Sequence, residues 1–163
     1  MRHWQASIVA MVFAGLLPSV GAAAAVNVTF VAPERYRDFR SSGSRNATLN
    51  QFRRIFTQLG TRYLKPGQSL SIDVLDIDLA GEYEPWSGRL NDVRIMRDIT
   101  PPRIRMRYVL RENGRVLARA EETVSDMNYL MNPSARRSGE QLAYEKDMLR
   151  DWFRSRFGSA RPR

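Results

Sequence analysis

The 163-residue chain contains no cysteine and a single histidine, His3. The lack of cysteine excludes disulfides, thiol nucleophiles and thiolate metal ligands. The lack of any histidine after His3 excludes a serine–histidine pair and a histidine metal site from the rest of the chain. Glycine-rich loops with Rossmann or P-loop spacing are also missing. Enzymatic chemistry would therefore depend on carboxylates, tyrosine, arginine or lysine, and no cofactor is expected.

Apolar runs long enough to span a bilayer, roughly 20 residues, are missing as well. The apolar segment 8–17 follows Arg2 and is succeeded by Pro18 and a small-residue tract at 21–25. This pattern is typical of a secretory signal peptide with cleavage near residue 24 or 25 rather than of a membrane anchor. We therefore predict a signal peptide at 1–25, a single α+β domain at 26–158, a disordered basic tail at 159–163, and a periplasmic location.

Acidic residues are scarce relative to basic ones. The chain has 17 acidic and 26 basic residues, a net charge of +9, and only two lysines, Lys65 and Lys146. A basic surface favours anionic partners. In the cell envelope we expect the partner to be an anionic component or a periplasmic protein, with at most peripheral membrane contact. Nucleic acid is not an expected partner, and the oligomeric state stays open.

An alternating pattern predicts a β-hairpin between residues 99 and 126. Apolar residues alternate with arginines across 104–110, and Asn-Gly at the centre is a strong turn signal. A three-residue loop with Gly114 as a left-handed bulge would pair Leu110 with Val116 and keep the apolar residues on one face. The opposite face then carries Arg103, Arg105, Arg107 and Arg111. We predict a positive φ at Gly114.

A strand expected at 70–79 contains three acids, which are Asp73, Asp76 and Asp78. Its apolar alternation changes face between Val74 and Leu75, which predicts a bulge there. The acids would then lie beside the hairpin arginines as a structural ladder. The same acids resemble the start of a calcium loop, but Ser87 stands where that loop needs a glutamate. We therefore expect no metal site.

Two amphipathic helices are expected. The first begins at a capping box formed by Thr48 and carries apolar residues at intervals of three and four across 49–63. The second begins at a similar box at Ser138 and ends near Phe157, before Gly158. The second helix is basic and amphipathic, a pattern that suits either a membrane surface or docking on a sheet. We expect docking, because an exposed sheet face needs a cover.

The predicted fold class is α+β: a mostly antiparallel sheet of about five strands with two amphipathic helices packed on one face. The strands are expected at 26–30, 70–79, 93–96, 104–110 and 116–124. A turn at 132–133 separates the hairpin from the last helix, because Asn-Pro favours turns.

Three stretches, PPRIRMRYVL, SDMNYL and YEKDMLRDWF, follow the signal peptide. With them the chain resembles a family of secreted proteobacterial proteins catalogued only as a domain of unknown function, domain of unknown function 3016. The resemblance covers nearly the whole mature chain. It implies a periplasmic single domain and transfers no catalytic residue.

The predicted function is a basic binding or interaction module of the cell envelope without a catalytic set. The candidate binding residues are Arg94, Arg103, Arg105, Arg107, Trp86 and Tyr129. If the hairpin arginines were buried, the binding surface would lie in the loop 35–45 instead. The alternative is a carboxylate-based hydrolase acting on an envelope glycan. Its acids would come from Asp73, Asp76, Asp78, Glu82 and Glu84. We expect no enzyme, because acid pairs in sheets are rarely catalytic.

Overall fold

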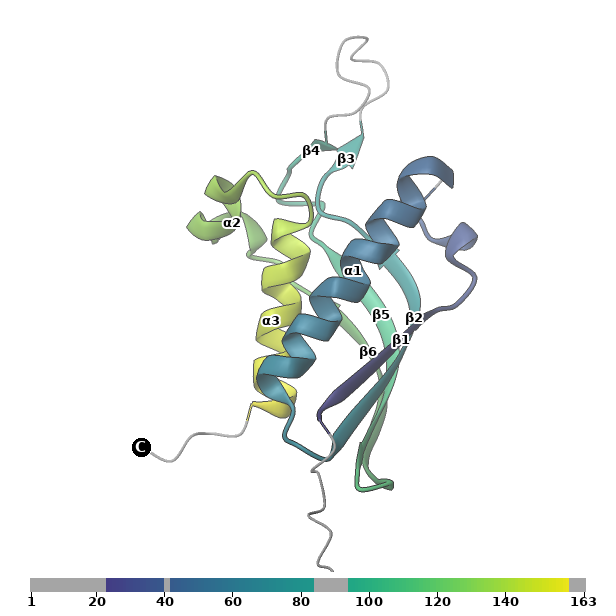
Figure 1. Cartoon of the computed structure of the whole chain (residues 1–163). Helices are drawn as coiled ribbons and strands as arrows, with labels where there is room; N and C mark the ends of the chain where they lie inside the picture. The colour runs from purple at the N-terminus through teal and green to yellow at the C-terminus, as the bar shows by residue number, and fades with distance from the viewer. Residues whose placement is uncertain (1–22, 40–41, 84–93, 159–163) are drawn as a thin grey trace, which may run out of the picture.

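The computed structural model describes residues 23–39, 42–83 and 94–158 (Figure 1). The predicted tail, Trp86, Glu84 and all but the end of the predicted signal peptide lie outside the described residues. The elements are β1 Ala25–Phe30, a 3₁₀ turn Pro33–Arg35, α1 Ser42–Tyr63, β2 Gln68–Asp78, β3 Glu82–Tyr83, β4 Arg94–Ile95, β5 Arg103–Glu112, β6 Arg115–Ser125, a 3₁₀ turn Tyr129–Met131, α2 Pro133–Ser138 and α3 Ala143–Phe157.

The strands and helices form two layers. The main sheet has the strand order β1-β2-β5-β6, in which β1 is parallel to β2 and the other neighbours are antiparallel. Helices α1 and α3 lie side by side on one face of it (Figure 1). The α+β prediction is confirmed, but the main sheet has four strands in the described part of the chain rather than about five. The strand expected at 93–96 is β4, which pairs with β3 in a separate sheet, because Pro101 and Pro102 lack amide donors to continue the ladder into β5.

The hairpin turns more tightly than the sequence analysis predicts. Asn113 and Gly114 both have positive φ, 48° and 83°, which is the conformation of a two-residue type I′ turn. The positive φ at Gly114 is confirmed. The three-residue loop and its pairing of Leu110 with Val116 are wrong, because Asn-Gly adopts the turn whose twist matches that of the strands.

The extra residue lies in β6 rather than in the turn. The register shifts at Leu117, so that Leu110 pairs with Ala118 and Met106 pairs with Glu122. Because of this bulge, Ala118 and its apolar neighbours on alternate positions still pack against the core. The same shift brings a carboxylate, that of Glu122, to the helix-covered side of the sheet.

The bulge predicted in β2 is confirmed. Val74 pairs with Met106 and Asp76 pairs with Arg105, so Leu75 is the extra residue. Apolar residues before and after the bulge are therefore buried on the same side. Val74 and Ile77 are both fully buried.

Helix α1 begins at Ser42, earlier than the predicted start at Thr48. Thr48 is buried inside the helix, and the Gln51 side chain donates to the backbone oxygen of Gln141 at 2.9 Å. The capping box is therefore wrong, because the preceding residues contain no proline and continue the helix. The apolar stripe is confirmed, with Phe52 and Phe56 fully buried in the core.

The chain before α3 forms a short helix where a turn was predicted. Asn132 caps α2, since its side chain accepts from two amides of the first turn. Gly139 ends α2 with a φ of 61°, so the predicted capping box at Ser138 is wrong. Helix α3 then starts after Leu142, without a side-chain cap. Its end at Gly158 and its packing on the sheet are as predicted.

Candidate functional site

Three predicted binding residues lie on the face of the sheet opposite the helices, which we call the open face. These are Arg103, Arg105 and Arg107 of β5, and all three are exposed, whereas the residues between them are buried. The exposed fractions of the Arg105 and Arg107 side chains are 53% and 56%. The hairpin alternation therefore places them as predicted, and the loop 35–45 is not needed as a substitute.

The acids of β2 lie beside these arginines. The register pairs Asp73 with Arg107, Asp76 with Arg105 and Asp78 with Arg103, so the predicted position of the acids beside the hairpin arginines is confirmed. Within the described part of the chain, however, no ion pair of 4.0 Å or less joins the two strands. Arg105 and Arg107 instead approach Glu121 of β6, at 3.8 and 3.4 Å. Such exposed pairs contribute roughly 0 to 1 kcal/mol each, so the arginines are aligned but only loosely held.

The positive charge of the domain is concentrated in the helices. The four strands of the main sheet carry six arginines and six acidic residues, so their charges sum to zero. The three helices carry ten basic residues and three acidic ones. Helix α1 alone has four arginines and no acid. The sheet as a whole is therefore balanced in charge, the open face carries rows of both signs, and the excess positive charge lies in the helices.

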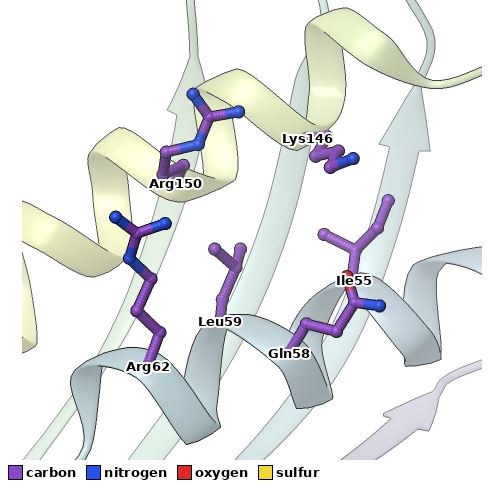
Figure 2. A pocket seen from close by; sticks show the side chains of 6 residues that line it. All are labelled: Ile55, Gln58, Leu59, Arg62, Lys146 and Arg150. Carbon is purple, nitrogen blue, oxygen red and sulfur yellow. The ribbon is translucent and has the colours of Figure 1, made fainter. Parts of the chain in front are cut away.

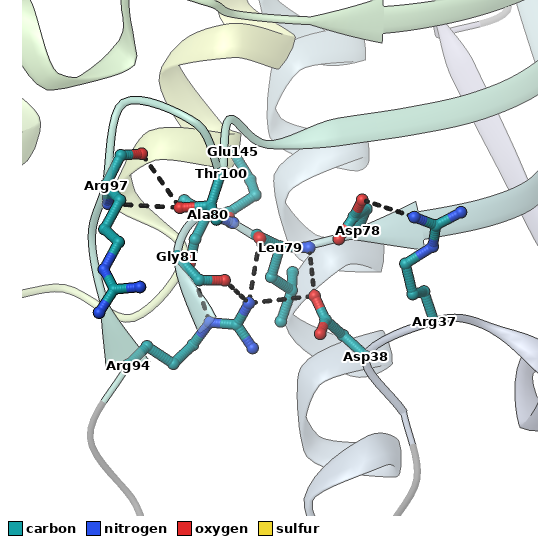
Figure 3. A network of polar contacts seen from close by, with 10 residues as sticks. All are labelled: Arg37, Asp38, Asp78, Leu79, Ala80, Gly81, Arg94, Arg97, Thr100 and Glu145. Carbon is teal, nitrogen blue, oxygen red and sulfur yellow. Dashed lines mark hydrogen bonds and ion pairs between the residues drawn. The ribbon is translucent and has the colours of Figure 1, made fainter. Parts of the chain in front are cut away.

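Arg94, another predicted binding residue, lies in a polar network at the end of β2 (Figure 3). The exposed fraction of its side chain is 12%, and its guanidinium pairs with Asp38 at 3.0 Å. It also donates to the backbone oxygens of Leu79, Ala80 and Gly81. The Asp38 carboxylate in turn accepts from the Leu79 amide at 2.6 Å. Arg94 thus joins three segments of the fold and faces inward.

Glu145 of α3 enters the same network from the helical side (Figure 3). The residue is 3% exposed, and its carboxylate accepts from the Ala80 amide at 2.7 Å. Burial raises the pKa of Glu145, while the Ala80 hydrogen bond and the charge of Arg94 act in the opposite direction. Sequence analysis missed this residue, because a glutamate among charged neighbours in a helix has the pattern of a solvated position.

Replacing Glu145 by glutamine is expected to remove a pH dependence of stability. The raised pKa means that the folded state holds its proton to higher pH than the unfolded state. The stabilisation linked to that proton is present at low pH and is lost as pH rises through the folded pKa. Urea unfolding between about pH 4 and pH 7 should show the wild type losing stability relative to Glu145→Gln. A difference in unfolding free energy between wild type and Glu145→Gln that stays constant across this pH range would contradict the buried position of the carboxylate.

Tyr129 does not face a partner, contrary to the sequence-based expectation. Its side chain is 1% exposed, its hydroxyl donates to the backbone oxygen of Arg97 at 2.5 Å, and its ring meets Tyr144 edge-on at 5.0 Å. A large ring with one polar tip is commonly buried in this way. Tyr129 fixes the chain that follows β6 and is unavailable for surface binding.

Asp73, Asp76 and Asp78, three acids of the hydrolase alternative, lie in a row along β2 rather than facing each other across a cleft. Burial and the nearby Asp38 raise the pKa of Asp78, while Arg37 and Arg103 lower it. Glu82 lies apart from this row, in β3. Among the described residues no group of three or more histidine, cysteine or acidic side chains could hold a metal ion. This arrangement is that of a charged sheet face and does not favour a hydrolase.

The fold and this surface define a two-layer α+β domain with a charge-striped sheet face that no described helix covers. Residues 24–155 match the model of a family described as "Protein of unknown function (DUF3016)". The chain belongs to this family, as its resemblance predicted. No curated protein and no solved structure matches it. No helix in the described ranges is long and apolar enough to cross a membrane.

Proposed function

We propose that this protein is a periplasmic binding module without catalytic activity, and that the open face of its sheet binds a protein partner. The observation that carries the proposal is the row of exposed arginines, Arg103, Arg105 and Arg107, on a sheet face that no described helix covers. The periplasmic location rests on the signal-peptide pattern of the sequence.

The charge pattern of the open face favours a protein over a uniformly anionic surface. An anionic bilayer or polysaccharide would attract the β5 arginines but repel the acids of β2 beside them. A protein can instead present an acidic row to β5 and a basic row to β2. Complementary rows would fix the register of the complex and reject partners with the wrong pattern.

The arginines are also free to change partners. Arg105 and Arg107 share the single carboxylate of Glu121 at 3.4 to 3.8 Å, and more than half of each side chain is exposed. Exchanging such weak contacts for a partner's carboxylates costs little. Guanidinium groups can bind those carboxylates with two parallel hydrogen bonds.

Site-specific photo-crosslinking in intact cells tests this proposal. A photoreactive residue at Thr123, which pairs with Arg105 and is exposed on β6, is expected to give one discrete crosslinked product. The same label at Thr57, exposed on α1, should not give that product. The double variant Arg105→Glu/Arg107→Glu should reduce the Thr123 product at least about tenfold, by reversing the charge of the interface.

A charge-matched variant separates a local effect from one of net charge. Arg53→Glu/Arg54→Glu changes the charge by the same amount on α1 and should leave the Thr123 product intact. The proposal is wrong if Thr123 gives no product while the chain is folded and exported. It is also wrong if both double variants reduce the product equally.

A further inference from the structure

Helices α1 and α3 border a hollow of about 400 Å³ on the helical side of the domain (Figure 2). Its lining residues are Ile55, Gln58, Leu59 and Arg62 of α1, with Lys146 and Arg150 of α3. Figure 2 shows Arg62 and Leu59 extending from α1 toward α3. Three of these side chains are cationic and none is acidic. The hollow lies within the layer that carries the excess positive charge.

We propose that this hollow binds an anionic amphiphile, a molecule with a phosphate or carboxylate group and an apolar tail. Arg62, Lys146 and Arg150 would hold the anionic group. The apolar part would lie on Ile55 and Leu59. This site is separate from the open face, on the other side of the sheet, and does not depend on the protein partner proposed there.

Of the three cations that line the hollow, we expect Arg62 to contribute most to binding an anion. Among the described residues no carboxylate lies within 4.0 Å of its guanidinium, which lies 5.7 Å from the centre of the neighbouring Tyr63 ring. Helix α1 contains no acidic residue that could neutralise it. A phosphate or carboxylate in the hollow would gain charge-assisted hydrogen bonds from this fork without displacing an existing ion pair.

The two cations of α3 differ in their roles. Lys146 pairs with Glu140 at 2.9 Å, but the exposed fractions are 40% and 57%, so the pair is weak and can be exchanged for a ligand. Arg150 pairs with Asp147, whose exposed fraction is only 11% and which also accepts from Asn132 at 2.6 Å. Asp147 therefore holds Arg150 in place beside the hollow.

The apolar lining indicates an amphiphile rather than a bare anion. Ile55 and Leu59 are 5% and 7% exposed and supply a surface of low polarity beneath the cations. Charges interact more strongly next to such a surface than in water. The hollow thus combines two apolar side chains with four polar or charged ones, and its volume is in the range of sites for small molecules. An inorganic anion would use the cations but make no contact with the exposed edges of Ile55 and Leu59.

Titration of the exported chain with octyl phosphate, inorganic phosphate and octyl glucoside tests the proposal, with backbone amide NMR shifts as the readout. Octyl phosphate, kept below its micellar concentration, is expected to bind about tenfold more tightly than inorganic phosphate, through burial of part of its chain. Octyl glucoside, which lacks the charge, should not bind. The shifts should centre on Leu59 and Lys146 and weaken with salt.

Two variants of α1, one inside the hollow and one outside it, provide a matched comparison of ligand affinity. Arg62→Gln should lower the affinity for octyl phosphate about tenfold, the loss of one charged contact. Arg54→Gln removes the same charge from an exposed position of α1 that does not line the hollow, and should leave the affinity unchanged. Equal losses in the two variants would overturn the proposal. So would equal binding of octyl phosphate and inorganic phosphate, the signature of an anion site without an amphiphile.

Sedimentation with anionic phospholipid vesicles distinguishes two sources of the ligand. Binding to these vesicles that Arg62→Gln abolishes would identify a lipid head group in a membrane surface. Binding to octyl phosphate but not to vesicles would identify a free amphiphile. If neither octyl phosphate nor the vesicles bind, the site is excluded. The open-face proposal would be unaffected, because Thr123 crosslinking does not involve these helices.

Discussion

Replacing Arg94 by methionine is expected to lower the free energy of unfolding by about 3 kcal/mol. The substitution leaves the carboxylate of Asp38, with an exposed fraction of 19%, without its guanidinium partner. It also removes the donor to three backbone oxygens at the end of β2. Breaking one side of a largely buried pair is costly, because the other charge stays in a site of low polarity.

Urea unfolding of Arg94→Met and of Arg54→Met measures this effect. Arg54 is exposed, so its substitution should change stability by no more than about 0.5 kcal/mol. Adding Asp38→Asn to Arg94→Met should recover part of the loss, because the uncompensated charge is then absent. If Arg94→Met is as mild as Arg54→Met but abolishes the open-face crosslink, Arg94 is a binding contact, as the sequence alone suggested.

The periodic parts of this fold could be predicted from the sequence. Alternation between arginine and apolar residues identified β5, and the change of face at Leu75 located the bulge that aligns Asp76 with Arg105. The stripe that includes Phe52 and Phe56 identified the buried side of α1. In each case, neighbours in the chain already differ in polarity according to the face they occupy.

The polar network could not be predicted, because its partners are far apart in the chain. Arg94 and Asp38 are separated by 56 positions, and Glu145 reaches the Ala80 amide across 65. Nothing in the local sequence distinguishes Arg94, which is inward-facing, from Arg103, which is exposed. Burial of a charged side chain depends on partners that only the tertiary structure brings together.

The hollow between α1 and α3 also could not be predicted from the sequence. The absence of acids from α1 is evident in the sequence, but only the packing of the two helices places Arg62 opposite Lys146 and Arg150.

The position of the bulge in the hairpin could not be predicted from the sequence either. A bulge in the turn and a bulge at Leu117 preserve the same alternation of apolar residues, and turn geometry decides between them.

Replacing Glu122 by alanine is expected to destabilise the domain by about 2 kcal/mol, whereas the same change at the adjacent Glu121 should cost no more than about 0.5 kcal/mol. Glu122 accepts from the Trp152 indole nitrogen at 3.0 Å and from Arg156 at 3.2 Å, with an exposed fraction of 20%. Its loss leaves a buried indole N–H without an acceptor. Glu121 is 45% exposed and forms ion pairs with Arg105 and Arg107 of the open face.

This pair of variants tests the bulge at Leu117. Without that extra residue the alternation of β6 would reverse, and Glu121 rather than Glu122 would face the helices. Thermal or urea unfolding of both variants should therefore show a larger loss for Glu122→Ala. The stability of Glu122→Gln should lie between those of the wild type and Glu122→Ala, because an amide oxygen still accepts from Trp152 while the charge opposite Arg156 is lost. The reverse order of the two alanine variants would place β6 in the unbulged register and remove Thr123 from the open face.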